Sequence, residues 1–279
     1  VIYDARDRAG GLNEFGIATY KTVDDFAQHE VDYVTAIGGI EIVTGQRLGN
    51  DLTIDDLTTK HDAVFVGIGL SGVNALGVDG EEDDAVASAV DFIAELRQAA
   101  DMATIPVGRR VMVIGGGMTA IDVATQAHLL GAQEVTIAYR RGREQMNASE
   151  VEQNQSTSKG VNIRHWMKPV EVTKSGSCSL HVKMEYTSLS GGRLSGTGKF
   201  QTFEVDQLFK AIGQTLEAGD TLSGITLEQG RIKIDEAFRT SNPSVWAGGD
   251  CTAGGDDLTV TAVAQGRDAA ESIHAALSA

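Results

Sequence analysis

Cysteine and proline are scarce in this chain of 279 residues, which holds 2 Cys and 3 Pro. Cys178 and Cys251 lie far apart and form no C-x-x-C pair. They cannot supply the four thiolates of an iron–sulfur cluster or a structural zinc site, and a disulfide framework is not expected. We therefore interpret both as free thiols and expect no metal site.

Long apolar runs and basic residues are also lacking. No apolar stretch approaches the ~18 residues that a membrane helix needs, and the N-terminus VIYDARDRAGG has no signal-peptide pattern. The 39 acidic residues outnumber the 23 basic ones, for a net charge of −16, so the basic footprint of a nucleic-acid-binding protein is missing. We expect a cytoplasmic protein that binds neither membranes nor nucleic acids.

Glycine, by contrast, is abundant, with 33 residues and no low-complexity stretch. Buried-strand patterns alternate with amphipathic helical patterns, which is typical of nucleotide-binding α/β folds. The expected helices cover residues 23–37, 83–100, 118–130, 148–159 and 259–276. The expected strands cover residues 1–4, 40–44, 63–66, 110–114, 135–139, 206–212 and 245–247, with a hairpin-rich stretch at 162–190 and a loop at 188–198.

One glycine-rich turn has the context of a dinucleotide site. Gly115, Gly117 and Ala120 fit the pattern G-x-G-x-x-A between a predicted buried strand and a predicted helix. The first glycine permits the tight turn, the second lets the backbone approach a pyrophosphate, and alanine allows close helix–strand packing. The helix N-terminus offers free N–H groups to the phosphates. The alternative is a plain glycine-rich turn.

The end of the next strand discriminates between nicotinamide cofactors. An NAD site usually carries an acid there, whereas an arginine accommodates the 2′-phosphate of NADP. This chain has Arg140 and Arg141, followed by Arg143, and arginine forms charge-assisted bidentate bonds to phosphate. The pattern favours NADPH over NADH. The alternative is that these arginines form salt bridges with the acidic surface.

Two acids follow other predicted strands. Asp4 ends the opening strand, where a Rossmann-type unit uses an acid to bond a ribose hydroxyl. Gly249 and Asp250 follow the last strand, where an acid can bond a flavin's ribityl chain and the next helix N-terminus can stabilise a reduced flavin. The alternatives are a turn residue at Asp4 and a helix-capping residue at Asp250.

The sequence contains an echo at domain scale. A strand followed by glycine occurs at Gly67-Ile68-Gly69 and again at Ala211-Ile212-Gly213. We predict an α/β fold of two Rossmann-like, three-layer dinucleotide-binding domains, with the nicotinamide domain inserted in the flavin domain. The flavin domain comprises residues 1–106 and 236–279, and the NAD(P)H domain residues 107–235.

These motifs together resemble a known family, the NAD(P)H-oxidising FAD flavoprotein module of glutamate synthase small subunits and dihydropyrimidine dehydrogenases. The resemblance covers the whole chain. It rests on Gly10-Gly11-Leu12, Asp62-Ala63-Val64-Phe65, Gly115-Gly116-Gly117-Met118-Thr119-Ala120-Ile121-Asp122, Tyr139-Arg140-Arg141, Ala247-Gly248-Gly249-Asp250 and Gly266-Arg267-Asp268-Ala269-Ala270.

The resemblance implies the cofactors, the partner and the site residues. Hydride would pass from NADPH to FAD, and electrons would leave singly to the iron–sulfur centres of a partner subunit or domain; no side chain need act as acid or base. FAD would contact Asp4, Gly11, Leu12, Lys21, Leu48, Gly249, Asp250 and Val260. NADPH would contact Gly115, Gly117, Thr119, Ala120, Arg140 and Arg141, and Gly213 is assigned to cofactor binding as well.

The chain departs from this family in three respects. The family's first strand with its G-x-G-x-x-G loop and its cysteine-rich N-terminal domain are missing, so we expect an N-terminally truncated module. Lys21 replaces the usual arginine, and Ala18 and Asn147 replace prolines. The alternative function is an NADP(H)-binding or interaction module without turnover. A disulfide reductase of the thioredoxin-reductase kind would need a C-x-x-C pair, which the sequence lacks.

Overall fold

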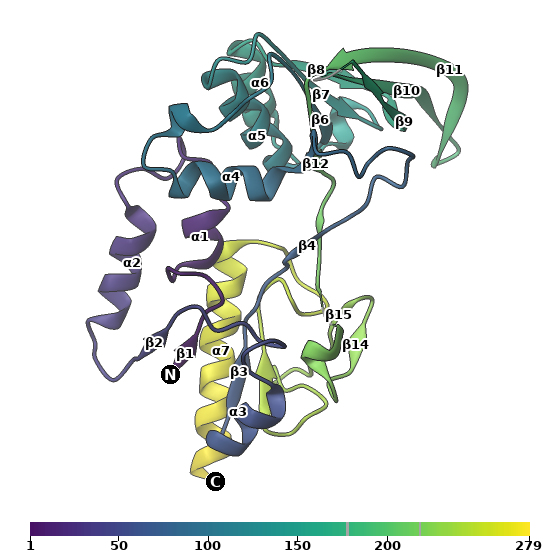
Figure 1. Cartoon of the computed structure of the whole chain (residues 1–279). Coiled ribbons are helices and arrows are strands. Elements are labelled where there is room, and N and C mark those ends of the chain that lie inside the picture. The colour runs from purple at the N-terminus through teal and green to yellow at the C-terminus, as the bar shows by residue number, and fades with distance from the viewer. Residues whose placement is uncertain (177–178, 218) are drawn as a thin grey trace. The chain divides into compact units, whose positions relative to one another are not determined.

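The computed structural model describes residues 1–176, 179–217 and 219–279, so Cys178 lies outside the described residues. Its contacts divide the chain into two compact units. Unit 1 comprises residues 1–10, 28–72 and 214–279, and unit 2 comprises residues 11–27 and 73–213. The short strands β4 (Gly72–Val73) and β13 (Gln214–Thr215) carry the chain between the units (Figure 1).

Unit 2 is built on a five-stranded parallel sheet with the strand order β5-β12-β6-β7-β8. These strands are β5 (Val86–Ser88), β6 (Arg110–Gly115), β7 (Glu134–Tyr139), β8 (Asn162–His165) and β12 (Gln207–Ala211). Its helices are α4 (Ala89–Gln98), α5 (Met118–Leu129) and α6 (Glu150–Ser158), with single 3₁₀ turns at Met102–Thr104 and Arg143–Gln145.

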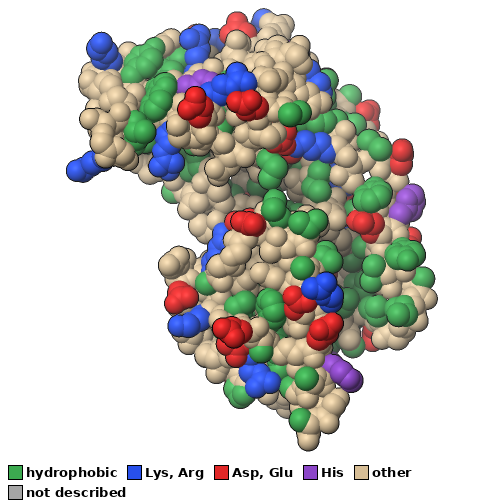
Figure 2. All heavy atoms as spheres, turned by 180° about the vertical axis from the view of Figure 1, so that it is seen from behind, with side chains coloured by type: hydrophobic (Ala, Val, Ile, Leu, Met, Phe, Trp, Pro, Cys, Tyr) green, Lys and Arg blue, Asp and Glu red, His purple; other side chains and the backbone are tan. Residues whose placement is uncertain are grey.

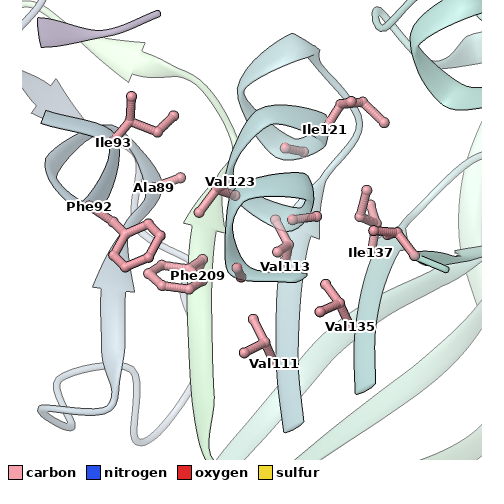
Figure 3. Packing of buried hydrophobic residues seen from close by; sticks show 14 of the residues in the cluster. Ala89, Phe92, Ile93, Val111, Val113, Ile121, Val123, Val135, Ile137 and Phe209 are labelled. Carbon is pink, nitrogen blue, oxygen red and sulfur yellow. The ribbon is translucent and has the colours of Figure 1, made fainter. Parts of the chain in front are cut away.

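Both faces of this sheet are covered. Val111 and Val113 on β6 pack with Phe92 and Ile121 of the helices (Figure 3). Their neighbours Met112 and Ile114 pack instead against an antiparallel sheet of β9 (Met167–Ser175), β10 (Ser179–Ser190) and β11 (Arg193–Val205). Burial of both faces explains why β6 is continuously apolar. Unit 2 therefore has three layers, of helices, parallel sheet and antiparallel sheet.

Unit 1 contains shorter strands and the longest of the described helices, α7 (Thr259–Ser278). Its strand pairs are the parallel β1 (Ile2–Tyr3) with β2 (Ile42–Val43), the parallel β3 (Val64–Val66) with β16 (Val245–Ala247), and the hairpin of β14 (Leu227–Glu228) with β15 (Arg231–Ile232). Its helices are α2 (Phe26–Thr35), α3 (Ile54–Lys60) and α7 (Thr259–Ser278), with a 3₁₀ turn at Gly219–Leu222. Buried apolar residues of β3, β16 and α3 form its core.

Residues 11–27 belong to unit 2 by their contacts. Helix α1 (Gly11–Phe15) and the turn after it are held by Arg97 of α4, whose Nη1 donates to the carbonyls of Ile17 (3.0 Å) and Thr22 (3.3 Å). Thr19 donates its N–H to Gln126 Oε1 of α5 at 3.0 Å. These bonds attach segment 11–27 to the helical layer of unit 2.

The predicted α/β class is confirmed, but two local predictions are wrong. Residues 86–88 are strand β5 rather than helix, because they pair in parallel with β12. Most of Ser188–Gly198 lies in β10 and β11 rather than in a loop, since Gly191 and Gly192 adopt φ values of +55° and +78° and turn the chain in two residues.

The compact units also have other boundaries than the predicted domains. Residues 73–106 pack with the predicted NAD(P)H domain, and residues 214–235 pack with the remainder of the predicted FAD domain. The cause lies in pairing and packing, since β5 joins the sheet of unit 2 and Ile232 enters the core of unit 1.

The charged surface is mixed in sign. On the face seen in Figure 2, acidic and basic side chains are interspersed rather than gathered by sign. No helix among the described residues is long and apolar enough to cross a membrane.

Candidate functional site

The turn after β6 contains two glycines that packing requires. Gly115 has φ +154°, and a Cβ there would lie 2.1 Å from the carbonyl oxygen of Ala211 on the neighbouring strand. A Cβ on Gly116 would lie 2.4 Å from the ring of Tyr139. Any larger residue would collide with these neighbours, so both positions need glycine for the turn to pack against the adjacent strands.

Gly117 differs, because nothing lies within 4 Å of the position that a Cβ would occupy. It is the N-cap of α5 and forms no side-chain cap. In the part of the chain that the structure describes, no acceptor lies against the N–H groups of Met118 and Thr119. Ala120, one turn on, is fully buried against the sheet. The helix N-terminus therefore presents free N–H donors to open space, which suits an anion.

The other predicted NADPH residues lie at the same sheet edge. Strands β12, β6 and β7 are parallel and adjacent, so their carboxyl ends share one edge. Gly213 (φ +94°) follows β12 there and accepts a backbone hydrogen bond from Asn74 N–H at 3.2 Å. Arg140 and Arg141 follow β7. The parallel topology brings the glycine turn, the arginine pair and Gly213 to one edge.

The arginine side chains are not engaged by the acidic surface. Arg140 is exposed and Arg141 half-exposed, and among the described residues neither forms a salt bridge. Arg143 donates from Nη2 to the amide oxygen of Asn154 at 2.5 Å, which is no ion pair. The alternative of surface salt bridges is not observed, so the guanidinium groups of Arg140 and Arg141 are available to an external anion.

Lys21 is committed to other groups. Its Nζ lies 2.8 Å from Asp122 Oδ1 and 2.9 Å from Glu152 Oε1, and Tyr20 donates its hydroxyl to the same Asp122 oxygen at 2.7 Å. We call these four residues the acidic latch. Partial burial disfavours the charged form of Lys21, but the hydrogen bonds that its ammonium donates to Asp122 and Glu152 outweigh this effect and raise its pKa. The ammonium of Lys21 is thus ion-paired within unit 2.

The predicted flavin residues fall in both units. Gly11 (φ +52°, with open space around its Cβ position) and Leu12 (44% exposed) belong to helix α1 and unit 2. Asp4 and Leu48 belong to unit 1. Asp4 accepts the N–H of Arg6 at 2.8 Å, which is the turn role considered above, and half-buried Leu48 packs against the core.

The remaining flavin residues lie after β16. Gly249 (φ +79°) donates its N–H to Gln265 Oε1 of α7 at 2.6 Å. Burial, and then the charge of Asp257, raises the pKa of the half-buried Asp250 carboxyl, while Arg231 opposes that shift. Val260, in the first turn of α7, is 74% exposed. A destabilised carboxylate and a bare apolar side chain thus lie beside one helix N-terminus.

Sequence reasoning missed several residues that shape the site. Asp122 is a charged residue at a buried position of α5, and the pattern Ser149-x-x-Glu152 is a capping box that could have been recognised. Trp166 and Thr187, which contact the chain at Arg140 and Arg141, carry no sequence signal because their contacts are long-range.

Comparisons with known proteins show similarity over nearly the whole chain. The chain is 34% identical to the glutamate synthase [NADPH] small chain of Escherichia coli over 297 residues, covering 98% of this chain and 62% of that protein. It is 32% identical to the NAD-dependent dihydropyrimidine dehydrogenase subunit PreT of Escherichia coli, covering 98% of this chain and 61% of that one. The chain therefore spans about three fifths of the length of these relatives.

The fold has a solved counterpart. FprA from Mycobacterium tuberculosis superimposes with a TM-score of 0.83 at 16% identity, covering 99% of this chain and 77% of that one. The predicted two-domain Rossmann-like architecture is thereby confirmed. Residues 4–266 match the sequence pattern of the pyridine nucleotide-disulphide oxidoreductase family. With the glycine turn, the parallel sheet and these relatives in agreement, the chain belongs to the pyridine nucleotide-disulphide oxidoreductase family.

Proposed function

We propose that this chain is the electron-input module of an NADPH-oxidising flavoprotein. The observation that carries the proposal is the open N-terminus of α5 at Gly117. It lies on the same sheet edge as two arginines that have no carboxylate partner among the described residues. A dinucleotide carrying a 2′-phosphate matches both features, because its pyrophosphate binds free N–H donors and its 2′-phosphate binds guanidinium groups.

In unit 2, the residues proposed to hold NADPH have separate tasks. Gly115 and Ala120 shape the turn, Gly117 and Thr119 present backbone to the pyrophosphate, and Gly213 flanks them just after β12. Arg140 and Arg141 would recognise the 2′-phosphate through charge-assisted bonds, which distinguish NADPH from NADH.

The proposed flavin residues are those implied by the family resemblance. In unit 1, Asp4 would bond the ribose, Leu48 would contact the adenine, and Gly249, Asp250 and Val260 would lie at the flavin end. In unit 2, Gly11 and Leu12 present open backbone and an exposed side chain, whereas the Lys21 ammonium is already ion-paired. When bound, FAD would accept hydride from NADPH and release electrons singly.

Asp250 fits the flavin end by its electrostatics. Its carboxylate is held partly out of water near a second carboxylate, so a hydrogen-bond donor on a ligand would stabilise it. The residues present thus fit a polar, donor-bearing group at the N-terminus of α7. Positioning, rather than proton transfer by a side chain, is the work proposed for them.

The electron acceptor is proposed from the same resemblance. Relatives named as a glutamate synthase small chain and a dihydropyrimidine dehydrogenase subunit are, by name, parts of larger enzymes. We propose that the electrons pass to an iron–sulfur-containing catalytic subunit or domain.

The testing experiment is a titration of the purified chain with NADPH and NADH, with and without added FAD, followed by the flavin's visible absorbance. Bleaching by NADPH in preference to NADH supports the proposal. Binding of NADPH without any flavin retention or reduction would instead indicate a binding module without turnover. Binding of neither nucleotide would overturn the functional interpretation of residues 115–120.

The arginine pair provides a sharper test within this titration. We expect Arg140→Gln and Arg141→Gln each to weaken NADPH binding about tenfold, the effect of one lost charge-assisted bond, and to leave NADH binding unchanged. Arg193→Gln is the matched control, because Arg193 is an exposed arginine at the start of β11. Equal loss for both nucleotides would contradict a 2′-phosphate role.

A further inference from the structure

The main chain of the arginine pair is fixed by two residues from the antiparallel sheet side of unit 2. Thr187 donates its hydroxyl to the carbonyl oxygen of Arg140 at 2.7 Å. The N–H of Trp166 donates to the carbonyl oxygen of Arg141 at 3.2 Å. Thr187 also donates its own N–H to the carbonyl of Trp166 at 2.8 Å. Both carbonyls of the arginine pair are therefore held by one connected set of hydrogen bonds.

Thr187 is placed for this contact by an irregularity in its strand. The pairing of β10 with β11 shifts register between Glu185 and Thr187, as at a β-bulge. A bulge redirects the side chain that follows it and is frequent beside functional sites. Thr187 is only 5% exposed, and its buried hydroxyl donates to the carbonyl of Arg140.

Trp166 has a backbone conformation that a bulky residue rarely adopts. Its φ is +60°, in the left-handed region, between β8 and β9. Such a conformation persists when its surroundings determine it, and it marks functional sites more often than chance. Its indole ring also lies against Gly142, where a Cβ would meet Trp166 Cζ2 at 2.8 Å. The residue after the arginine pair is thus closely packed as well.

The far end of the same loop is closed by its own contacts. Tyr139 donates its hydroxyl to the carbonyl of Gln145 at 2.5 Å, and Gln145 Oε1 accepts the N–H of Gly142 at 3.0 Å. The loop from Arg140 to Gln145 is therefore anchored on both sides, while the guanidinium groups of its arginine pair keep no carboxylate partner among the described residues. Fixed backbone with free cationic tips is the arrangement of a preorganised anion receptor.

We propose that Thr187 and Trp166 are positioning residues that set the selectivity of Arg140 and Arg141 for a 2′-phosphate. The proposal deepens and rests on the proposed function. Thr187 acts through the main chain of Arg140 and does not itself touch the nucleotide. Loss of its hydroxyl frees the loop, so the arginines must be ordered at the moment of binding, and affinity for the 2′-phosphate falls.

The test compares Thr187→Val with wild type in binding 2′,5′-ADP and 5′-AMP, measured by isothermal titration calorimetry. We expect Thr187→Val to weaken 2′,5′-ADP binding about fivefold, the effect of one lost hydrogen bond, with 5′-AMP binding unchanged. Thr187→Ser, which keeps the hydroxyl, should restore the wild-type affinity. Amide exchange at residues 142–145 should be faster in Thr187→Val than in wild type.

Thr197→Val is the matched control, since Thr197 donates its hydroxyl to the carbonyl of Tyr186 in the same sheet. Unchanged 2′,5′-ADP affinity in Thr187→Val, or equal weakening for both probes, overturns the positioning role while leaving the NADPH proposal intact. A wild-type chain that does not prefer 2′,5′-ADP overturns the proposed NADPH selectivity, and the positioning role with it.

Discussion

Adjacent glycines in the turn after β6 have different physical reasons to be glycine. Gly115 and Gly116 are required by neighbours already in the structure, Ala211 and Tyr139 respectively. None of the described residues requires a glycine at position 117, because nothing lies near its Cβ position and its φ of −95° is open to any residue. Because folding does not require glycine at position 117, we infer that close approach of a ligand to the backbone does.

This contrast predicts opposite effects for two similar substitutions. Gly115→Ala should lower the free energy of unfolding by more than ~2 kcal/mol, because the new methyl meets a carbonyl oxygen in a backbone conformation that alanine disfavours. Gly117→Ala should cost only about a few tenths of a kcal/mol as an N-cap change, yet weaken NADPH binding about tenfold. Urea unfolding and nucleotide titration measure the two effects. Unchanged NADPH affinity in Gly117→Ala would argue against a pyrophosphate at this turn.

Asp250 predicts a conflict between stability and binding. Its pKa is raised in the folded chain by burial and by Asp257, so the ionised carboxylate costs stability at pH values above the ordinary value of 3.8. Asp250→Asn should therefore stabilise unit 1 by about 0.5 kcal/mol near neutral pH, since solvent screens a half-buried group, and the gain should vanish as the pH falls below about 4.

The same variant should retain less FAD if the carboxylate serves the flavin. Thermal unfolding at two pH values and flavin content after gel filtration are the measurements. Asp257→Asn is the control, because it removes the carboxylate that repels Asp250 and leaves the Asp250 carboxylate in place. Stabilisation of Asp250→Asn that persisted at low pH would contradict the burial account.

At the scale of elements, segment 11–27 and helix α5 form one structural piece. The acidic latch places one lysine ammonium between carboxylates of α5 and α6, while Arg97 of α4 binds the carbonyls of the same segment. Asp122 lies about one helical turn beyond the open N–H groups of α5. Lys21 therefore neutralises negative charge close to a proposed phosphate site.

Lys21→Met should show how much the carboxylates of Asp122 and Glu152 destabilise the fold when they have no cation. We expect it to lower the free energy of unfolding by about 2 kcal/mol at pH 7, because it leaves two partly buried carboxylates without their cation. Although burial alone raises the pKa of Glu152, hydrogen bonds from Lys21 and Ser149 hold it below its ordinary value of 4.5. That contribution is present above pH 4.5 and is lost as the pH falls through the lowered pKa.

The difference between Lys21→Met and wild type should therefore be largest between about pH 5 and 10 and should shrink below about pH 4. At the alkaline end, the pKa of Lys21 is raised above its ordinary value of 10.5, so the stability from its ion pairs is complete below pH 10.5. This contribution is lost as the pH rises through the raised pKa. Urea unfolding at pH 7 and pH 3.5 measures the difference. Lys199→Met, an exposed lysine on β11, is the control. An equal loss at both pH values would contradict the ionic explanation.

At the scale of the whole molecule, NADP⁺ and FAD should protect different segments of the chain. NADP⁺ should slow amide exchange at residues 115–120 and 139–146 of unit 2, and FAD should slow it at residues 248–262 of unit 1. Exchange measured by mass spectrometry with each nucleotide alone gives the comparison, with adenosine as the control ligand. Protection of residues 248–262 by NADP⁺ alone would contradict the assignment of that segment to the flavin.

Local patterns in the sequence were sufficient for the fold class and for much of the candidate site. The glycine turn after β6, the helix position of Ala120 and the arginines after β7 can be recognised from patterns within about thirty residues, although Gly115 packs against the distant Ala211. Strand, turn and helix preferences encode such features directly. Family membership was accessible for the same reason, since the motifs that carry it are short and contiguous.

Tertiary structure alone decided the partners of these residues and the limits of the units. Strand β5 was expected as helix because only its pairing with β12, more than a hundred residues away, makes it a strand. Lys21 contacts Asp122, and Thr187 contacts Arg140 across 47 residues of sequence, so these contacts are long-range as well. Local propensity carries no information about contacts that chain folding brings together, whereas burial and hydrogen-bond satisfaction determine them once the sheet has formed.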